Sequence, residues 1–120
     1  MSRDHRKLRV FAAADELVMT VYRCTSRFPA AEKYGLQIQI RRAAVSAVVN
    51  IVEGAARRSK HEYLHFLNVA AGSASEARYL VDLSSRLGLI DSAENESIQR
   101  GYTDLVAGLV ALINSLSPKP

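Results

Sequence analysis

The chain has 120 residues, of which 48% are hydrophobic and 23% are charged, and its formal net charge is +4. This composition predicts one globular domain with a hydrophobic core and excludes a disordered or low-complexity chain. The single cysteine excludes an intrachain disulfide, and the longest apolar run is shorter than the roughly 20 residues of a membrane span. We therefore expect a cytoplasmic protein with no signal peptide and no membrane partner.

The charge is distributed unevenly along the chain. Residues 1–60 carry 12 basic and 5 acidic groups, whereas residues 61–120 carry 4 basic and 7 acidic groups. Such an asymmetry predicts a basic surface and favours a polyanionic partner.

The first predicted helix runs from about residue 7 to residue 27 and follows a basic tail at residues 1–6. Its apolar residues recur at steps of four and three, which places them on one face of a helix. They are Val10, Ala14, Leu17, Val21, Cys24 and Phe28. Because Cys24 lies on this face, we expect a buried thiol rather than a reactive one. Pro29 and then Gly35 mark the turn that follows.

The second predicted helix, from Gly35 to about Arg58, is apolar on nearly every side, as expected for a helix covered on both flanks. A narrow polar stripe runs along it, and such groups need partners when they are buried. We predict a structural polar network made of Arg42, Ser46, Asn50, Glu53, Glu62 and Glu76. A hairpin that turns near residue 58 brings Arg42 level with Glu76, which predicts an ion pair between them.

Two further helices follow, each opened by a capping sequence. Residues 59–62 read Ser-Lys-His-Glu, a capping box, and the helix that they open ends near Gly88. Residues 91–94 open the fourth helix, which ends before Pro118. Four helices with short connections and no strand-like alternation predict an all-α, antiparallel, up-down-up-down four-helix bundle over residues 7–117.

The ordered motifs of this chain resemble those of the four-helix-bundle family named for open reading frames in 23S rRNA intervening sequences. The resemblance covers roughly residues 8–116. It is carried by Tyr34-Gly35-Leu36, Gln39 to Ser46, Asn50-Ile51, Glu53-Gly54, Arg58-Ser59, Glu62, Phe66-Leu67, Ala70 to Ser73 and Glu76.

The resemblance implies a bacterial cytoplasmic bundle that assembles as a homopentamer and has no established biochemical activity. A similar bundle is the accessory protein of diversity-generating retroelements, in which a basic pentamer is associated with nucleic acid and a reverse transcriptase. The family name refers to rRNA through gene location, so it does not imply a ribosomal component.

The basic residues give the best candidate binding surface. We predict RNA or DNA contacts at Arg41, Arg57, Arg58 and Lys60, three of which fall at the turn between the second and third helices. No aromatic residues alternate with these charges as they do in many nucleic-acid binding sites. The alternative is therefore a solvated face on a purely structural module that binds another protein.

One catalytic motif needs separate consideration. His61-Glu62-Tyr63-Leu64-His65 matches the H-E-x-x-H pattern of zinc hydrolases, in which both histidines bind the metal and the glutamate is a general base. Here the pattern falls on the first turn of a helix, Glu62 already serves the capping box, and no third ligand follows. We therefore predict no metal, no cofactor and no enzymatic activity.

The apolar residues of the second and third helices exceed what one bundle can bury. Ile38, Val45, Val49 and Val52 form a second flank on one helix, and Phe66, Val69, Leu80, Leu83 and Leu87 form one on the other. Contiguous apolar patches of more than a few hundred Å² usually mark an interface. We expect a homo-oligomer that closes into a ring, and the family resemblance makes a pentamer the best estimate.

Overall fold

The computed structural model describes residues 3–116, with the side chain of Lys7 left aside. These residues form four long α-helices and no strand. The helices are α1 (Arg9–Thr25), α2 (Leu36–Ala55), α3 (Lys60–Arg86) and α4 (Ser92–Leu116), with short 3-10 turns at His5–Lys7 and Ala30–Glu32. Residues 1–2 of the expected tail, residue 117 of the expected domain and Pro118 lie outside the described residues.

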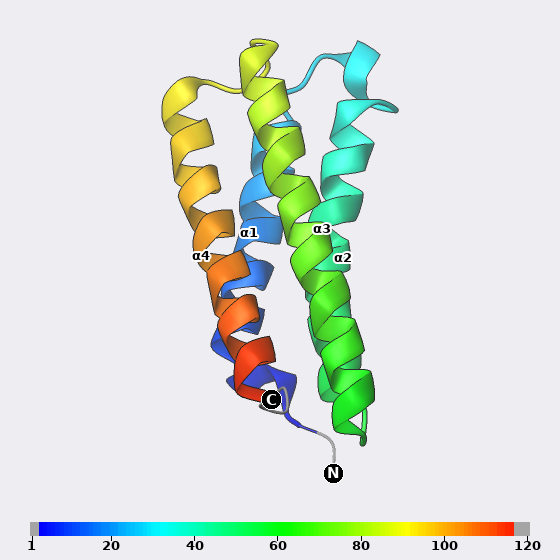
Figure 1. Cartoon of the computed structure of the whole chain (residues 1–120). Coiled ribbons are helices and arrows are strands. Elements are labelled where there is room, and N and C mark those ends of the chain that lie inside the picture. The colour runs from blue at the N-terminus through cyan, green and yellow to red at the C-terminus, as the bar shows by residue number, and fades with distance from the viewer. Residues whose placement is uncertain (1–2, 117–120) are drawn as a thin grey trace.

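The four helices run alternately up and down in an elongated bundle of 46 × 23 × 21 Å (Figure 1). Each helix packs beside the next in the chain, and α4 returns to lie beside α1. The all-α fold predicted from the sequence is therefore confirmed, and its up-down order can be followed in the colours of Figure 1.

The helix ends follow local chemistry. Ser59 caps α3 by accepting a hydrogen bond of 3.0 Å from the Glu62 N–H, and Asp91 accepts one of 2.8 Å from the Glu94 N–H at the start of α4. Gly88 has a φ of +82°, a conformation that glycine adopts without strain, and it follows the C-terminus of α3. The capping residues therefore predicted the starts of α3 and α4 correctly.

Helix α1 is two residues shorter than predicted at each end. Its start is replaced by the His5–Lys7 turn, where the Asp4 carboxylate accepts the Arg6 N–H at 3.1 Å. Its end lies ahead of Phe28, because a residue that precedes a proline is disfavoured in helical conformation.

The core consists of the residues that the helical spacing predicted. All six seam residues of α1 and its following turn are buried, and Cys24 is among them. Burial and the nearby Glu94 carboxylate raise the pKa of Cys24 to about 11, which keeps the thiol protonated and unreactive near neutral pH.

One apolar assignment differs from the prediction. Leu80, expected on the outer flank of α3, is only 8% exposed and belongs to the core. The seam of a long helix drifts around its axis, so a residue next to the predicted stripe becomes covered. Across residues 3–116, no helix has the length and apolar composition needed to cross a bilayer.

Candidate nucleic-acid interface

The turn between α2 and α3 forms one end of the bundle and carries most of the predicted basic residues. Gly54 allows the two helices to meet here, because a Cβ at this position would lie 3.0 Å from Phe66 Cβ and 3.2 Å from Tyr63 Cδ1. The chain then leaves α2 at Ala55 and enters α3 at Lys60. Close packing therefore holds Arg57 and Arg58 in a short, well-defined connection.

Arg3, in the N-terminal segment that precedes α1, lies at this same end of the bundle and extends its basic surface. Its backbone N–H donates to the Ala55 carbonyl at 2.7 Å, and its Nη1 donates to the Arg57 carbonyl at 3.3 Å. Its guanidinium lies 4.0 Å from the centre of the Tyr63 ring. Burial raises the pKa of Tyr63, and the positive charge of Arg3 opposes that shift. These hydrogen bonds hold the segment that precedes α1 against the C-terminus of α2.

Among the cations of the turn, Arg57 differs from its neighbours. Its Nη2 donates to Glu53 Oε2 at 2.9 Å, and its guanidinium covers the Phe66 ring at 4.9 Å. Arg58 and Lys60 are exposed, and within residues 3–116 neither forms an ion pair or a hydrogen bond through its side chain. The two side chains available for an external anion are therefore Arg58 and Lys60.

Arg41 is not part of this surface. It lies on the first half of α2, four turns from Arg57, and it is engaged with α1. Its Nε donates to the Thr25 hydroxyl at 2.9 Å, its Nη2 donates to the Tyr22 carbonyl at 3.2 Å, and its guanidinium lies 4.4 Å from the Tyr22 ring centre. These contacts connect α2 to the last turn of α1, where backbone carbonyls need hydrogen-bond donors. Arg41 therefore has a structural role, in addition to its predicted contact with nucleic acid.

The polar stripe of α2 is smaller than the predicted network. Ser46 Oγ and Ser73 Oγ of α3 are 2.8 Å apart, and Asn50 Nδ2 donates to the Ser46 carbonyl at 2.8 Å and to its hydroxyl at 3.1 Å. The prediction that Asn50 is hydrogen-bonded is confirmed, although its partner is its own helix. Spacing along α2 could not reveal Ser73, because the contact depends on how α3 packs.

The remaining members of the predicted network lie outside it. Arg42 and Glu76 are exposed, and no ion pair joins them within residues 3–116, so the predicted intrachain pair is wrong. Both side chains are exposed and lie outside the buried contact between α2 and α3. Glu53 is exposed and pairs with Arg57, while Glu62 accepts a hydrogen bond of 3.2 Å from the Ser59 hydroxyl.

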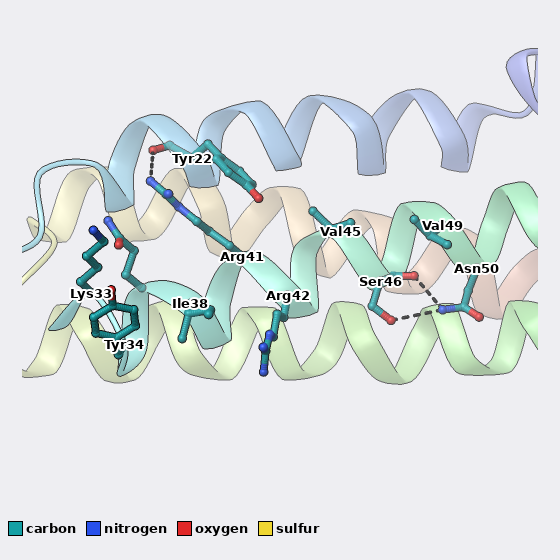
Figure 2. Close-up of a pocket in the computed structure, with 11 residues that line it drawn as sticks. Tyr22, Lys33, Tyr34, Ile38, Arg41, Arg42, Val45, Ser46, Val49 and Asn50 are labelled. Atoms are coloured by element: carbon teal, nitrogen blue, oxygen red, sulfur yellow. Dashed lines mark hydrogen bonds between the residues drawn. The ribbon is translucent and has the colours of Figure 1, made fainter.

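A groove of about 680 Å³ runs along the outer side of α2 (Figure 2). Arg41 points toward Tyr22 on α1, whereas Arg42 points to the opposite side of the helix. Ile38, Val45 and Val49 supply apolar side chains along the groove, and Ser46 and Asn50 lie toward one end. The groove is lined by Tyr22, Lys33, Tyr34, Gln37, Ile38, Arg41, Arg42, Val45, Ser46, Val49 and Asn50.

The histidines of the H-E-x-x-H pattern lie on the first turns of α3. Both His61 and His65 are exposed, and with Arg57 and Phe66 they line a shallow cavity of about 590 Å³. In the part of the chain that the structure describes, no group of three or more histidine, cysteine or acidic side chains converges on a common point.

Comparison with known proteins places this architecture in a family. The family described as 23S rRNA-intervening sequence protein matches residues 6–111. The chain belongs to this family. A search of curated proteins found no match. The family assignment agrees with the resemblance carried by the α2 and α3 motifs.

A solved structure shares the intervening-sequence bundle. It is the 1.70 Å crystal structure of a protein of unknown function from the S23 ribosomal protein family of Bacteroides thetaiotaomicron VPI-5482. The two chains are 24% identical, the TM-score is 0.81, and the match covers 88% of this chain and 95% of that one. At this identity the likeness establishes the fold alone.

Proposed function

We propose that this intervening-sequence protein is a cytoplasmic, non-enzymatic homo-oligomer that binds RNA or DNA at the α2–α3 end of its bundle. The observation that carries the proposal is the pair of exposed cations, Arg58 and Lys60, without acidic partners among residues 3–116. Arg3 and Arg57 lie beside them and add positive charge. The lone buried Cys24 is in keeping with a reducing compartment.

Oligomerisation would strengthen this surface. In a ring, preferably the pentamer that the family resemblance implies, the copies of the turn would lie in one annulus. Weak contacts made by each copy would then act together on one polyanion, which raises the overall affinity without any new contact. Because each phosphate contact releases counterions, binding should weaken steeply as salt increases.

The same oligomer without nucleic-acid affinity is the second candidate. It is favoured by the exposed apolar residues on α2 and α3, of which Val49 is 47% exposed and Val69 is 38% exposed. In this alternative the bundle would be an interaction module for a protein partner, and the basic turn would be a solvated end.

The test replaces Arg58 and Lys60 by glutamate and measures retention of a structured RNA over a salt series. We expect the double variant to lose at least tenfold in affinity at low salt and to have a shallower dependence of log K on log salt. The matched control replaces Arg23 and Arg100 by glutamate, which changes the net charge equally on exposed positions of α1 and α4.

Two results would decide against RNA or DNA binding at this end. One is equal affinity of wild type and the R58E/K60E variant; the other is an equal loss in the R23E/R100E control, which would indicate general charge attraction. Light scattering on the same samples measures the mass, which should remain several times 13.2 kDa in all three proteins.

A further inference from the structure

The outer sides of α2 and α3 carry residue patterns that the single chain does not explain. On α2, outward residues recur at steps of four and three, as in a helix that packs on a second surface. We call this set the α2 outer stripe: Ile38, Arg42, Val45, Val49 and Val52. On α3 the corresponding α3 outer stripe is Val69, Gly72, Glu76, Tyr79 and Leu83.

Both stripes are partly or fully exposed, and none of their residues is buried. Val49 is 47% exposed on α2, and Val69 and Tyr79 are 38% and 58% exposed on α3. Arg42 also lines the groove shown in Figure 2, where Val45 and Val49 form its apolar floor. Large side chains in a row at heptad spacing are typical of a helix seam rather than of a solvated face.

Each stripe contains one charged residue, and the two charges are opposite. Arg42 is the one cation of the α2 outer stripe, and Glu76 is the one anion of the α3 outer stripe. Within residues 3–116 neither side chain forms an ion pair or a hydrogen bond. A seam with a single charge favours a partner that carries the opposite charge at the facing position.

Gly72 gives an independent indication. It is exposed in the interior of α3, and a Cβ added there would have nothing within 4 Å. A glycine destabilises a helix interior relative to alanine, and packing inside this chain does not require one here. A small residue in the middle of an outer stripe would allow the backbone of another helix to approach closely.

We propose that the α2 outer stripe of one copy packs against the α3 outer stripe of the next copy, with Arg42 paired to Glu76 of the partner subunit. The proposal rests on the self-association included in the proposed function and identifies the surfaces that would produce it. The two stripes differ, so the contact is heterologous, and a heterologous contact closes into a ring when its rotation permits.

The test uses two single substitutions and their mixture. Arg42→Glu places two glutamates at the contact, and Glu76→Arg places two arginines there, so each variant alone should be a folded monomer by light scattering and circular dichroism. When the two variants are mixed in equal amounts, every contact between unlike chains joins opposite charges. We expect the mixture to form complexes of unlike chains, beginning with the dimer that contains one copy of each, detected by native mass spectrometry. Because two chains cannot alternate completely around a ring of five, ring closure is tested with the double variant R42E/E76R, which joins opposite charges at every contact and should recover the wild-type mass.

The mixture separates a pair between subunits from a pair within one chain, because mixing cannot repair an intrachain pair. The matched controls are Arg100→Glu and Glu96→Arg on the exposed side of α4, which should keep the wild-type mass alone and together. Gly72→Leu should weaken association at least tenfold while the helix content is unchanged.

The outcomes are distinguishable. If the wild-type protein is an oligomer and the Arg42 and Glu76 variants keep its mass, this contact is wrong while the proposed self-association stands. Monomeric variants that stay monomeric after mixing also overturn the pairing. A monomeric wild-type protein overturns both proposals, and RNA retention by the R58E/K60E variant tests the remaining part separately.

Discussion

The α1–α4 half of the bundle and its α2–α3 half use their apolar residues differently. The interior of the first half contains large side chains such as Leu17, Leu105 and Leu109, and its outer surface carries Met19, Tyr22 and Val110 among polar residues. The interior of the second half contains six alanines beside larger residues such as Ile40, Ile51 and Leu67, and its outer surface carries the exposed Val49, Val69 and Tyr79. The alanines are Ala43, Ala44, Ala47, Ala70, Ala74 and Ala77.

This difference follows from how closely two helices can approach. Alanines let α2 and α3 form the most extensive helix pair of the bundle, so little apolar volume fits between them. Several further apolar residues of these helices, Val49, Val69 and Tyr79 among them, lie on the outside, where the single chain does not cover them. The α1–α4 half also exposes apolar residues, namely Met19, Tyr22 and Val110, but Ala14 is the one buried alanine among its described residues.

The largest expected effect on stability comes from the α1–α4 interior. Leu105 is 1% exposed, so Leu105→Ala should lower the free energy of unfolding by about 2–5 kcal/mol through lost burial and a residual cavity. The control is Val110→Ala on the outside of the same helix, 44% exposed, which should change it by less than about 0.5 kcal/mol. Urea unfolding at equal protein concentration measures both free energies. If the two variants lost similar stability, the distinction between the buried and the exposed side of α4 would be wrong.

At the alanine positions of the α2–α3 interior, a larger side chain should lower the stability of the bundle. Ala47 has no exposed surface, so Ala47→Leu should destabilise the bundle by about 1–3 kcal/mol by forcing α2 away from its neighbours. The exposed Ala107 of α4 offers the matched control, since Ala107→Leu adds the same volume to the surface. A neutral Ala47→Leu in thermal unfolding would show that the helices are not closely packed at this level.

The smallest of the three expected effects is the difference in stability between variants of two adjacent arginines of α2. Arg41→Ala removes hydrogen bonds to Thr25 and Tyr22 and should lower the free energy of unfolding by about 1 kcal/mol. Arg42→Ala should leave the stability of the single bundle within about 0.5 kcal/mol. Chemical unfolding in dilute solution compares the two, and an equal effect would contradict the structural role of Arg41.

The sequence by itself determined the helices and much of the core. Helical spacing identified the seam of α1, and Ser59 and Asp91 identified the starts of α3 and α4, because periodicity and capping act over four or five residues. The family assignment was likewise available from ordered local motifs and was confirmed by the match over residues 6–111.

Only the tertiary structure decided which side of the bundle each polar residue occupies. Rotation of α2 about its axis turns Arg41 toward α1 and leaves Arg42 in water, although they are neighbours in the chain. The packing of α3 supplied Ser73 to Ser46, and the fold brought Arg3 to the α2–α3 turn across more than fifty residues. Contacts of this kind depend on how whole helices are placed relative to one another, and the local sequence pattern of a single helix does not predict that placement.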